Sequence, residues 1–142
     1  METIKLCLRI KTPASKVYRA LTEQEGLAGW WTQKVVARPE VGFVNEFRFE
    51  SRWLNKMKVI RLEPDTEVEW ECIGDTEEWI GTKLRFLLEE TEGITLLTFT
   101  HSRWAAQTAF FGQCSYHWGA YMKSLKDLAE TGKGFPNHEG AY

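Results

Sequence analysis

Apolar and polar residues alternate along the first eleven positions of the chain. One set of alternate positions holds Ile4, Leu6, Leu8 and Ile10, and charged or small residues hold the other. A two-residue period of this kind is typical of a β-strand that buries one of its faces. The sequence therefore predicts a half-buried strand over 3–11.

Two short helices are predicted directly after this strand. Thr12 and Pro13 suit an N-cap and a first helical residue, where the missing N–H of proline costs nothing. Thr22 and Glu25 have the spacing of a capping box, which predicts that a second helix starts at once. Glycines at positions 26 and 29 indicate that the second helix is short.

Short segments with the same two-residue period recur through the middle of the chain. They lie at 43–50, 53–63, 67–72, 83–89 and 95–100, separated by polar turns such as Gly74-Asp75 and Glu92-Gly93. Segment 53–63 is apolar on both faces, so its register stays open. Because no helix long enough for a parallel crossover separates the segments, the sequence predicts an antiparallel meander with one wet face.

The period changes to that of a helix from about residue 108 to residue 131. Apolar residues recur there at steps of three and four, at Phe111, Cys114, Trp118, Met122, Leu125 and Leu128. Such a helix is roughly 35 Å long, enough to span the sheet. Gly132 is placed to end it, and 132–142 is predicted to be an irregular tail. The pattern indicates a single α+β domain over 1–142.

Composition and charge exclude several classes of protein. Acidic and basic residues are interspersed and the net charge is −2, so the basic surface that nucleic acid requires is missing. No apolar segment has the length of a membrane span or the form of a signal peptide. Three widely spaced cysteines predict reduced thiols rather than a disulfide framework. We therefore expect a cytoplasmic protein.

Aromatic residues are unusually abundant, with seven Trp, eight Phe and four Tyr. Two interpretations fit this content: a bulky core, or the aromatic walls of a ligand pocket. The adjacent Trp30 and Trp31 are not expected to face the same way. We expect one of them to fill the core and the other to line or gate an entrance.

Motifs for catalysis or for cofactor binding are missing from the sequence. The three histidines, His101, His117 and His138, have no metal-ligand spacing, and there is no phosphate-binding loop or dinucleotide fingerprint. Cys114 and His117 share a helix face, but a buried cysteine is usually an inert small hydrophobe. His101 points inward, either as a hydrogen-bonded core residue or as a polar anchor for a ligand. No catalytic residue, metal or cofactor is predicted.

Several short motifs, taken together in their order, resemble one protein family. They are 13–22, Gly26-Leu27, Trp30-Trp31, Phe47-Arg48-Phe49, Glu63-Pro64, Val68-Glu69-Trp70, 97–102, and Tyr121 with 124–128. This order resembles the START-like superfamily (helix-grip, birch-pollen-allergen-like or SRPBCC), and within it the branch similar to the activator of the heat-shock protein 90 ATPase. The resemblance covers 4–132. It implies a helix-grip fold, in which a six- or seven-stranded antiparallel sheet wraps a long C-terminal helix.

The resemblance implies three alternative functions. We first expect a non-enzymatic module that binds an apolar or aromatic small molecule between sheet and helix, in a cavity of roughly 300–1,000 Å³. The alternatives are a co-chaperone-like interaction module connected with the stress response, and a cyclase- or aromatase-like enzyme. A chaperone partner and a homodimer are both compatible with the sequence. The predicted cavity residues are Trp30, Trp31, Phe47, Phe49, Trp70, Phe86, Phe99, His101, His117, Trp118, Tyr121 and Met122.

Overall fold

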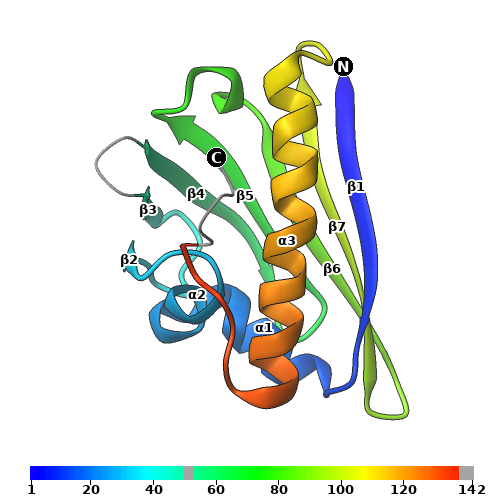
Figure 1. The fold of residues 1–142 in the computed structure, drawn as a ribbon. Coiled ribbons are helices and arrows are strands. Elements are labelled where there is room, and N and C mark those ends of the chain that lie inside the picture. The colour runs from blue at the N-terminus through cyan, green and yellow to red at the C-terminus, as the bar shows by residue number, and fades with distance from the viewer. Residues whose placement is uncertain (50–52, 138–142) are drawn as a thin grey trace.

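A computed structural model describes residues 1–49 and 53–137 (Figure 1). Residue 50, at the end of the segment predicted at 43–50, and residues 138–142 of the predicted tail, His138 among them, lie outside these residues. The chain opens with β1 (Glu2–Ile10), α1 (Ala14–Thr22) and α2 (Gln24–Trp30). The central elements are β2 (Lys34–Val36), β3 (Val44–Phe49), β4 (Trp53–Glu63), β5 (Glu67–Gly74), the 3₁₀ helix η1 (Glu77–Trp79), β6 (Lys83–Thr91) and β7 (Ile94–Trp104). The last element is α3 (Ala109–Thr131).

The strands form one antiparallel sheet in the order β1-β7-β6-β5-β4-β3-β2. Strands β2 to β7 are a meander, and β1 pairs with β7 at the other edge. The predicted antiparallel sheet is confirmed with seven strands. Strand β2 was not predicted, because three residues are too few to display a period.

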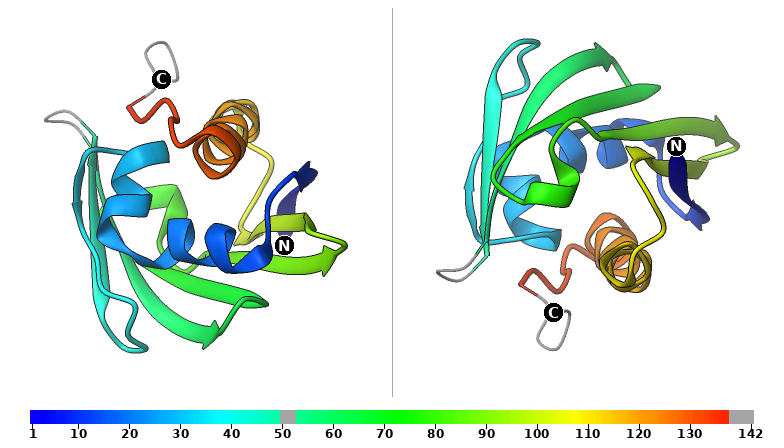
Figure 2. Two further views of the ribbon diagram at one scale, coloured as in Figure 1. Left: turned by 90° about the horizontal axis from the view of Figure 1, so that it is seen from below. Right: turned by 90° about the horizontal axis from the view of Figure 1, so that it is seen from above.

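The sheet curves around α3, which crosses its concave face, and α1 and α2 lie at one end of the molecule (Figures 1 and 2). This arrangement confirms the helix-grip fold. Among the described residues, no helix combines the length and the apolar composition that crossing a bilayer requires.

The ambiguous strand β4 changes its inward-facing set of residues along its length. Asn55, Met57 and Val59 are buried, but the pairing with β5 shifts between Val59 and Arg61. Such a bulge places one extra residue in a strand and reverses which positions face the core. Leu62 therefore packs against the core from the other parity. The bulge explains why the sequence is apolar on both faces.

Both predicted helix caps at the start of the chain are wrong. Helix α1 begins at Ala14. The Ala14 N–H donates to the Glu90 carboxylate at 2.8 Å, and Thr12 provides no side-chain cap. The hydroxyl of Thr22 donates to the Tyr18 carbonyl, so it is not available to cap α2. A carboxylate from β6 cannot be recognised from the local sequence, although it suits a helix N-terminus as well as a cap does.

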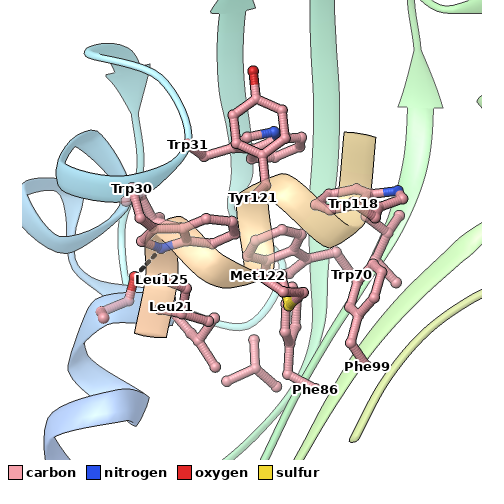
Figure 3. Packing of buried hydrophobic residues seen from close by; sticks show 14 of the residues in the cluster. Leu21, Trp30, Trp31, Trp70, Phe86, Phe99, Trp118, Tyr121, Met122 and Leu125 are labelled. Atoms are coloured by element: carbon pink, nitrogen blue, oxygen red, sulfur yellow. Dashed lines mark hydrogen bonds between the residues drawn. The ribbon is translucent and has the colours of Figure 1, made fainter. Parts of the chain in front are cut away.

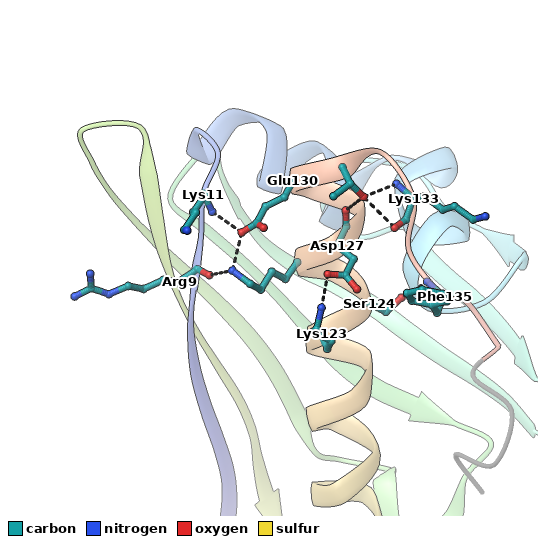
Figure 4. Close-up of polar contacts among 10 residues, drawn as sticks. Arg9, Lys11, Lys123, Ser124, Asp127, Glu130, Lys133 and Phe135 are labelled. Carbon is teal, nitrogen blue, oxygen red and sulfur yellow. Dashed lines mark hydrogen bonds and ion pairs between the residues drawn. The ribbon is translucent and has the colours of Figure 1, made fainter.

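Helix α3 has the boundaries that its sequence predicts. Thr108 caps it by accepting a hydrogen bond from the Phe111 N–H at 3.1 Å. Gly132 ends it in the left-handed conformation, with φ at 88°, which glycine adopts without steric cost. Near this end, Glu130 accepts hydrogen bonds from the Lys11 N–H and from Lys126, and so joins α3 to the end of β1 (Figure 4).

The described part of the tail is irregular, as predicted, but it is held against the domain. The Ser124 hydroxyl donates to the Trp30 carbonyl at 2.9 Å. The same hydroxyl accepts from the Phe135 N–H at 2.7 Å, and both of these residues are drawn in Figure 4. Asn137 adds a backbone hydrogen bond to the Trp31 carbonyl at 2.8 Å. The tail therefore fixes the loop that follows α2.

We expect Gly26→Ala to destabilise the protein strongly. A Cβ at this position would lie 2.6 Å from the Cα of Ala20 and 2.8 Å from the carbonyl oxygen of Arg19, which are backbone atoms of α1. Overpacking of this kind costs about 1–3 kcal/mol or more. Gly119→Ala is the matched control, because nothing lies within 4 Å of its added Cβ. This exposed helical site should gain about 0.5–1 kcal/mol. Urea denaturation gives both values, and equal free energies of unfolding for the two variants would contradict the expected close packing of α1 and α2.

Candidate functional site

Aromatic rings fill most of the space between the sheet and α3 (Figure 3). Trp31 lies at their centre, with its ring centroid 4.4 Å from that of Phe47, 5.2 Å from Trp118 and 6.1 Å from Trp70. The rings of Trp31 and Trp30 are stacked at 5.9 Å and 12°. The expectation that these two residues face different ways is therefore wrong. Trp30 fills the core and donates its indole N–H to the Ala20 carbonyl at 2.8 Å.

His101 is buried and joins the sheet to α3 through hydrogen bonds on both ring nitrogens. Its Nδ1 lies 3.1 Å from the Trp118 indole nitrogen, and its Nε2 lies 2.8 Å from the Thr82 hydroxyl. An indole N–H can only donate, so Nδ1 must accept and carry no proton. His101 is therefore a neutral imidazole with its proton on Nε2. The Thr82 hydroxyl accepts a hydrogen bond from this Nε2–H and donates one to the Trp79 carbonyl.

Burial lowers the pKa of His101 to about 3, because the charged imidazolium would lose its hydration inside the core. A second proton on Nδ1 would also break the bond from Trp118. Of the two roles left open by the sequence, the structure places this residue in the first, as a hydrogen-bonded core histidine.

A pocket opens to solvent beside the N-terminal half of α3, at the end of the helix away from α1. About 40 Å³ of it can hold the centre of a water-sized sphere, and the pocket with its open mouth encloses about 440 Å³ not occupied by atoms. By the first of these volumes the pocket is far smaller than the cavity expected from the sequence. Its lining residues are Trp31, Phe49, Asn55, Thr76, Trp79, Phe110, Cys114, His117, Trp118 and Tyr121.

The walls of the pocket are mainly apolar, and none of the described residues that line it is an Asp, Glu, Lys or Arg. Asn55 and Thr76 are joined by a hydrogen bond of 2.6 Å. Burial raises the pKa of the Cys114 thiol to about 12, so this sulfur is not a thiolate at neutral pH. Partial burial lowers the pKa of His117. The arrangement suits an uncharged ligand with an apolar surface.

The twelve predicted cavity residues fall into three groups. Five of them line the pocket: Trp31, Phe49, His117, Trp118 and Tyr121. Six pack in the closed core: Trp30, Phe47, Trp70, Phe86, Phe99 and Met122. His101 lies behind Trp118 and holds it in place. A role in ligand binding stays a prediction for those that line the pocket.

Half of the pocket lining was not among the predicted residues: Asn55, Thr76, Trp79, Phe110 and Cys114. Asn55 occupies an inward position of β4, whose register the sequence left open. Thr76 and Trp79 come from the β5–β6 connection, which has no period to show which way its side chains point. Cys114 belonged to the predicted inner stripe of α3, so its helical spacing could have identified it as a lining residue.

The helix-grip fold and the aromatic pocket place the chain in the class of START-like proteins. A family model described as "Activator of Hsp90 ATPase homolog 1-like protein" matches residues 11–130, and the chain belongs to this family. The resemblance stated from the sequence motifs is confirmed. No curated protein matches the chain with significance.

Solved structures of similar proteins support the same assignment. The solution structure of the Aha1 dimer from Colwellia psychrerythraea is 38% identical to this chain and superposes with a TM-score of 0.87. The match covers 94% of this chain and 100% of the Colwellia chain. A crystal structure from Mesorhizobium loti is 21% identical, covers 89% and 96% of the two chains, and has a TM-score of 0.79. A solution structure from Bacillus halodurans is 21% identical, covers 92% and 98%, and has a TM-score of 0.75. The last two show a shared fold.

We expect acid to destabilise the protein through His101. The His101 imidazole has a pKa of 6.5 in the unfolded chain and of about 3 in the folded protein. Below pH 6.5 the unfolded state therefore binds a proton that the folded state does not bind. This contribution to stability is complete above pH 6.5 and is lost as the pH falls toward 3, at up to about 1.4 kcal/mol per pH unit. The measurement is the free energy of unfolding against pH for the wild type and for His101→Gln, which cannot take up the proton. Identical pH slopes for the two proteins would contradict the assignment.

Proposed function

We propose that this protein is a non-enzymatic binding module for a small apolar or aromatic molecule, which enters the pocket beside the N-terminal half of α3. The observation that carries the proposal is the solvent-open pocket with aromatic walls and a few polar groups. Small-molecule sites have this composition in general. The small volume of the pocket restricts the ligand to one or two rings that are partly inserted.

The size of the pocket sets the expected affinity. An aromatic ring that buries about 150 Å² gains roughly 4 kcal/mol at 25 cal/mol per Å². This corresponds to a dissociation constant on the order of 1 mM for a bare ring. A tighter natural ligand needs further contacts at the mouth.

The chemistry of the buried groups favours binding over a cyclase- or aromatase-like reaction. A general base needs a pKa near the working pH, and burial lowers that of His101 to about 3. A thiol nucleophile needs a lowered pKa, and burial raises that of Cys72 to about 11. Burial raises the pKa of Cys114 as well. These groups are suited to structural roles.

Toluene, indole and naphthalene are suitable probes for the proposed pocket. We expect saturable NMR chemical-shift changes at residues that line it, including Cys114 and Trp79, and none at the distant turn near Gly93. Cys114→Phe places a ring in the pocket and should abolish these changes. Cys7→Phe makes the same substitution at an exposed position of β1 and should leave them intact. If none of the three probes shifts a lining residue of the wild type at millimolar concentration, the proposal is wrong.

A second candidate function is that of a co-chaperone-like module that acts on an Hsp90 ATPase and forms a homodimer. It rests on the family match and on the 38% identity to the Aha1 dimer, extended over almost the whole chain. The nearly filled interior also agrees with a role played by the surface. A homodimer would have twice the mass of 16.5 kDa for one chain.

Two measurements test this candidate. We expect a several-fold increase in the ATPase rate of purified Hsp90 on addition of excess protein, and none with an unrelated protein of similar size and charge. Sedimentation equilibrium gives the oligomeric state independently. An unchanged ATPase rate together with a monomeric mass would exclude this function while leaving the small-molecule proposal intact.

A further inference from the structure

Asn55 is a polar side chain of the pocket lining that is almost fully buried and still has an unused donor. It occupies an inward position of β4, opposite Phe47 of β3, and only 4% of its surface is exposed. Its Oδ1 accepts a hydrogen bond from the Thr76 hydroxyl at 2.6 Å. Its Nδ2 has no hydrogen-bond partner among the described residues. The amide therefore retains two N–H groups that can donate.

The Nδ2 atom of Asn55 remains accessible although the residue as a whole is buried. In the described part of the chain, the only side-chain nitrogen or oxygen atoms that are both fully closed off and without a partner are the indole nitrogens of Trp79 and Trp104. Nδ2 has no partner and is not one of these atoms, so it keeps accessible surface. Because Asn55 faces the inside of the sheet and lines the pocket, we assign this surface to the pocket.

The backbone around this side-chain pair holds the amide in one orientation. The Asp75 N–H donates to the Leu54 carbonyl at 2.8 Å, which joins the two segments one residue before the pair. The Thr76 carbonyl accepts from the Trp79 N–H at 2.9 Å, at the start of η1. The Thr76 hydroxyl has a single proton and donates it to Oδ1, so the amide oxygen faces Thr76 and the nitrogen is left for the pocket.

The surroundings of this donor favour an acceptor without charge. None of the described residues that line the pocket is an Asp, Glu, Lys or Arg. A carboxylate or phosphate would therefore lose its hydration there without a counter-charge. The oxygen of a hydroxyl or carbonyl group loses far less hydration and accepts equally well from an amide N–H.

We propose that Asn55 determines the specificity of the pocket by donating a hydrogen bond from Nδ2 to an uncharged oxygen of an aromatic ligand. The ligand is thus an aromatic compound with a hydroxyl or carbonyl group, and neither a plain hydrocarbon nor a carboxylic acid. This inference rests on the proposed small-molecule function and specifies which end of the ligand is inserted. The apolar ring then lies against aromatic residues of the lining such as Phe49 and Phe110.

Two matched pairs of compounds test the proposed donor. Phenol and toluene differ in OH against CH₃, and acetophenone and α-methylstyrene differ in C=O against C=CH₂. NMR titration into the wild type and into Asn55→Leu gives the ratio of affinities within each pair. A neutral hydrogen bond changes an affinity about fivefold. We expect the preference for the oxygen compound to fall about fivefold in Asn55→Leu for at least one pair, and the pair that responds identifies the kind of oxygen.

Asn45→Leu is the matched control, because it makes the same substitution at a buried position of β3 outside the pocket lining. It should leave both ratios unchanged. The side-chain amide resonances of Asn55 give a second test that needs no substitution. One of them should move downfield with the oxygen compound of a responding pair and stay nearly unmoved with its hydrocarbon, while the amide resonances of Asn45 respond to none of the four.

The outcomes separate this inference from the proposed function. If the compounds bind the wild type but neither the ratios nor the Asn55 resonances distinguish oxygen compound from hydrocarbon, Asn55 is only a part of the wall and the inference is overturned. If none of the four compounds shifts a lining residue of the wild type, the proposed function fails with it.

Discussion

The hydrogen bond from the Trp118 indole to Nδ1 of His101 is the interaction on which the rest of the site depends. It bonds a side chain of α3 to a side chain of β7 inside the core. A bond at 3.1 Å between two residues exposed by 2% or less favours one rotation of the helix against the sheet, together with the packing of the Trp118 ring on Trp31 and Phe99. Cys114, His117 and Tyr121, within one turn on either side of Trp118, reach the pocket because of this setting. The hydrogen bond requires a neutral imidazole, because Nδ1 can accept from the indole N–H only while it carries no proton.

The indole side chains decide how much space the fold leaves for a ligand. A sheet wrapped around a helix can enclose a large cavity, but here the rings of Trp30, Trp31 and Trp70 occupy that space. The close-packed rings fill the cavity, and their contacts with one another stabilise the domain. What remains open lies at the mouth. The small pocket is therefore consistent with partial insertion of a ligand or with recognition at the surface.

Much of the fold could be predicted from the sequence because period and parity are local properties. The alternation in β1 and the helical stripe of α3 gave their elements within one or two residues. Contacts between distant segments were not predictable in this way. The Glu90 carboxylate that caps α1, and the bulge that reverses the parity of β4, belong to pairings that no local window contains.

The same limit applies to the pocket. Trp118 lies on α3, whose inward face can be read from the helical spacing. Trp31 is the residue after α2, and the sequence pointed to it through the adjacent tryptophan pair. Trp79 lies on a short 3₁₀ helix in the β5–β6 connection, where nothing local predicts its direction.

Yet the Trp79 carbonyl bonds Thr82, and Thr82 bonds His101. Trp79, which forms part of the pocket wall, is therefore joined through Thr82 and His101 to Trp118 of α3. A ligand that binds only the folded state stabilises this whole network together with the rest of the domain.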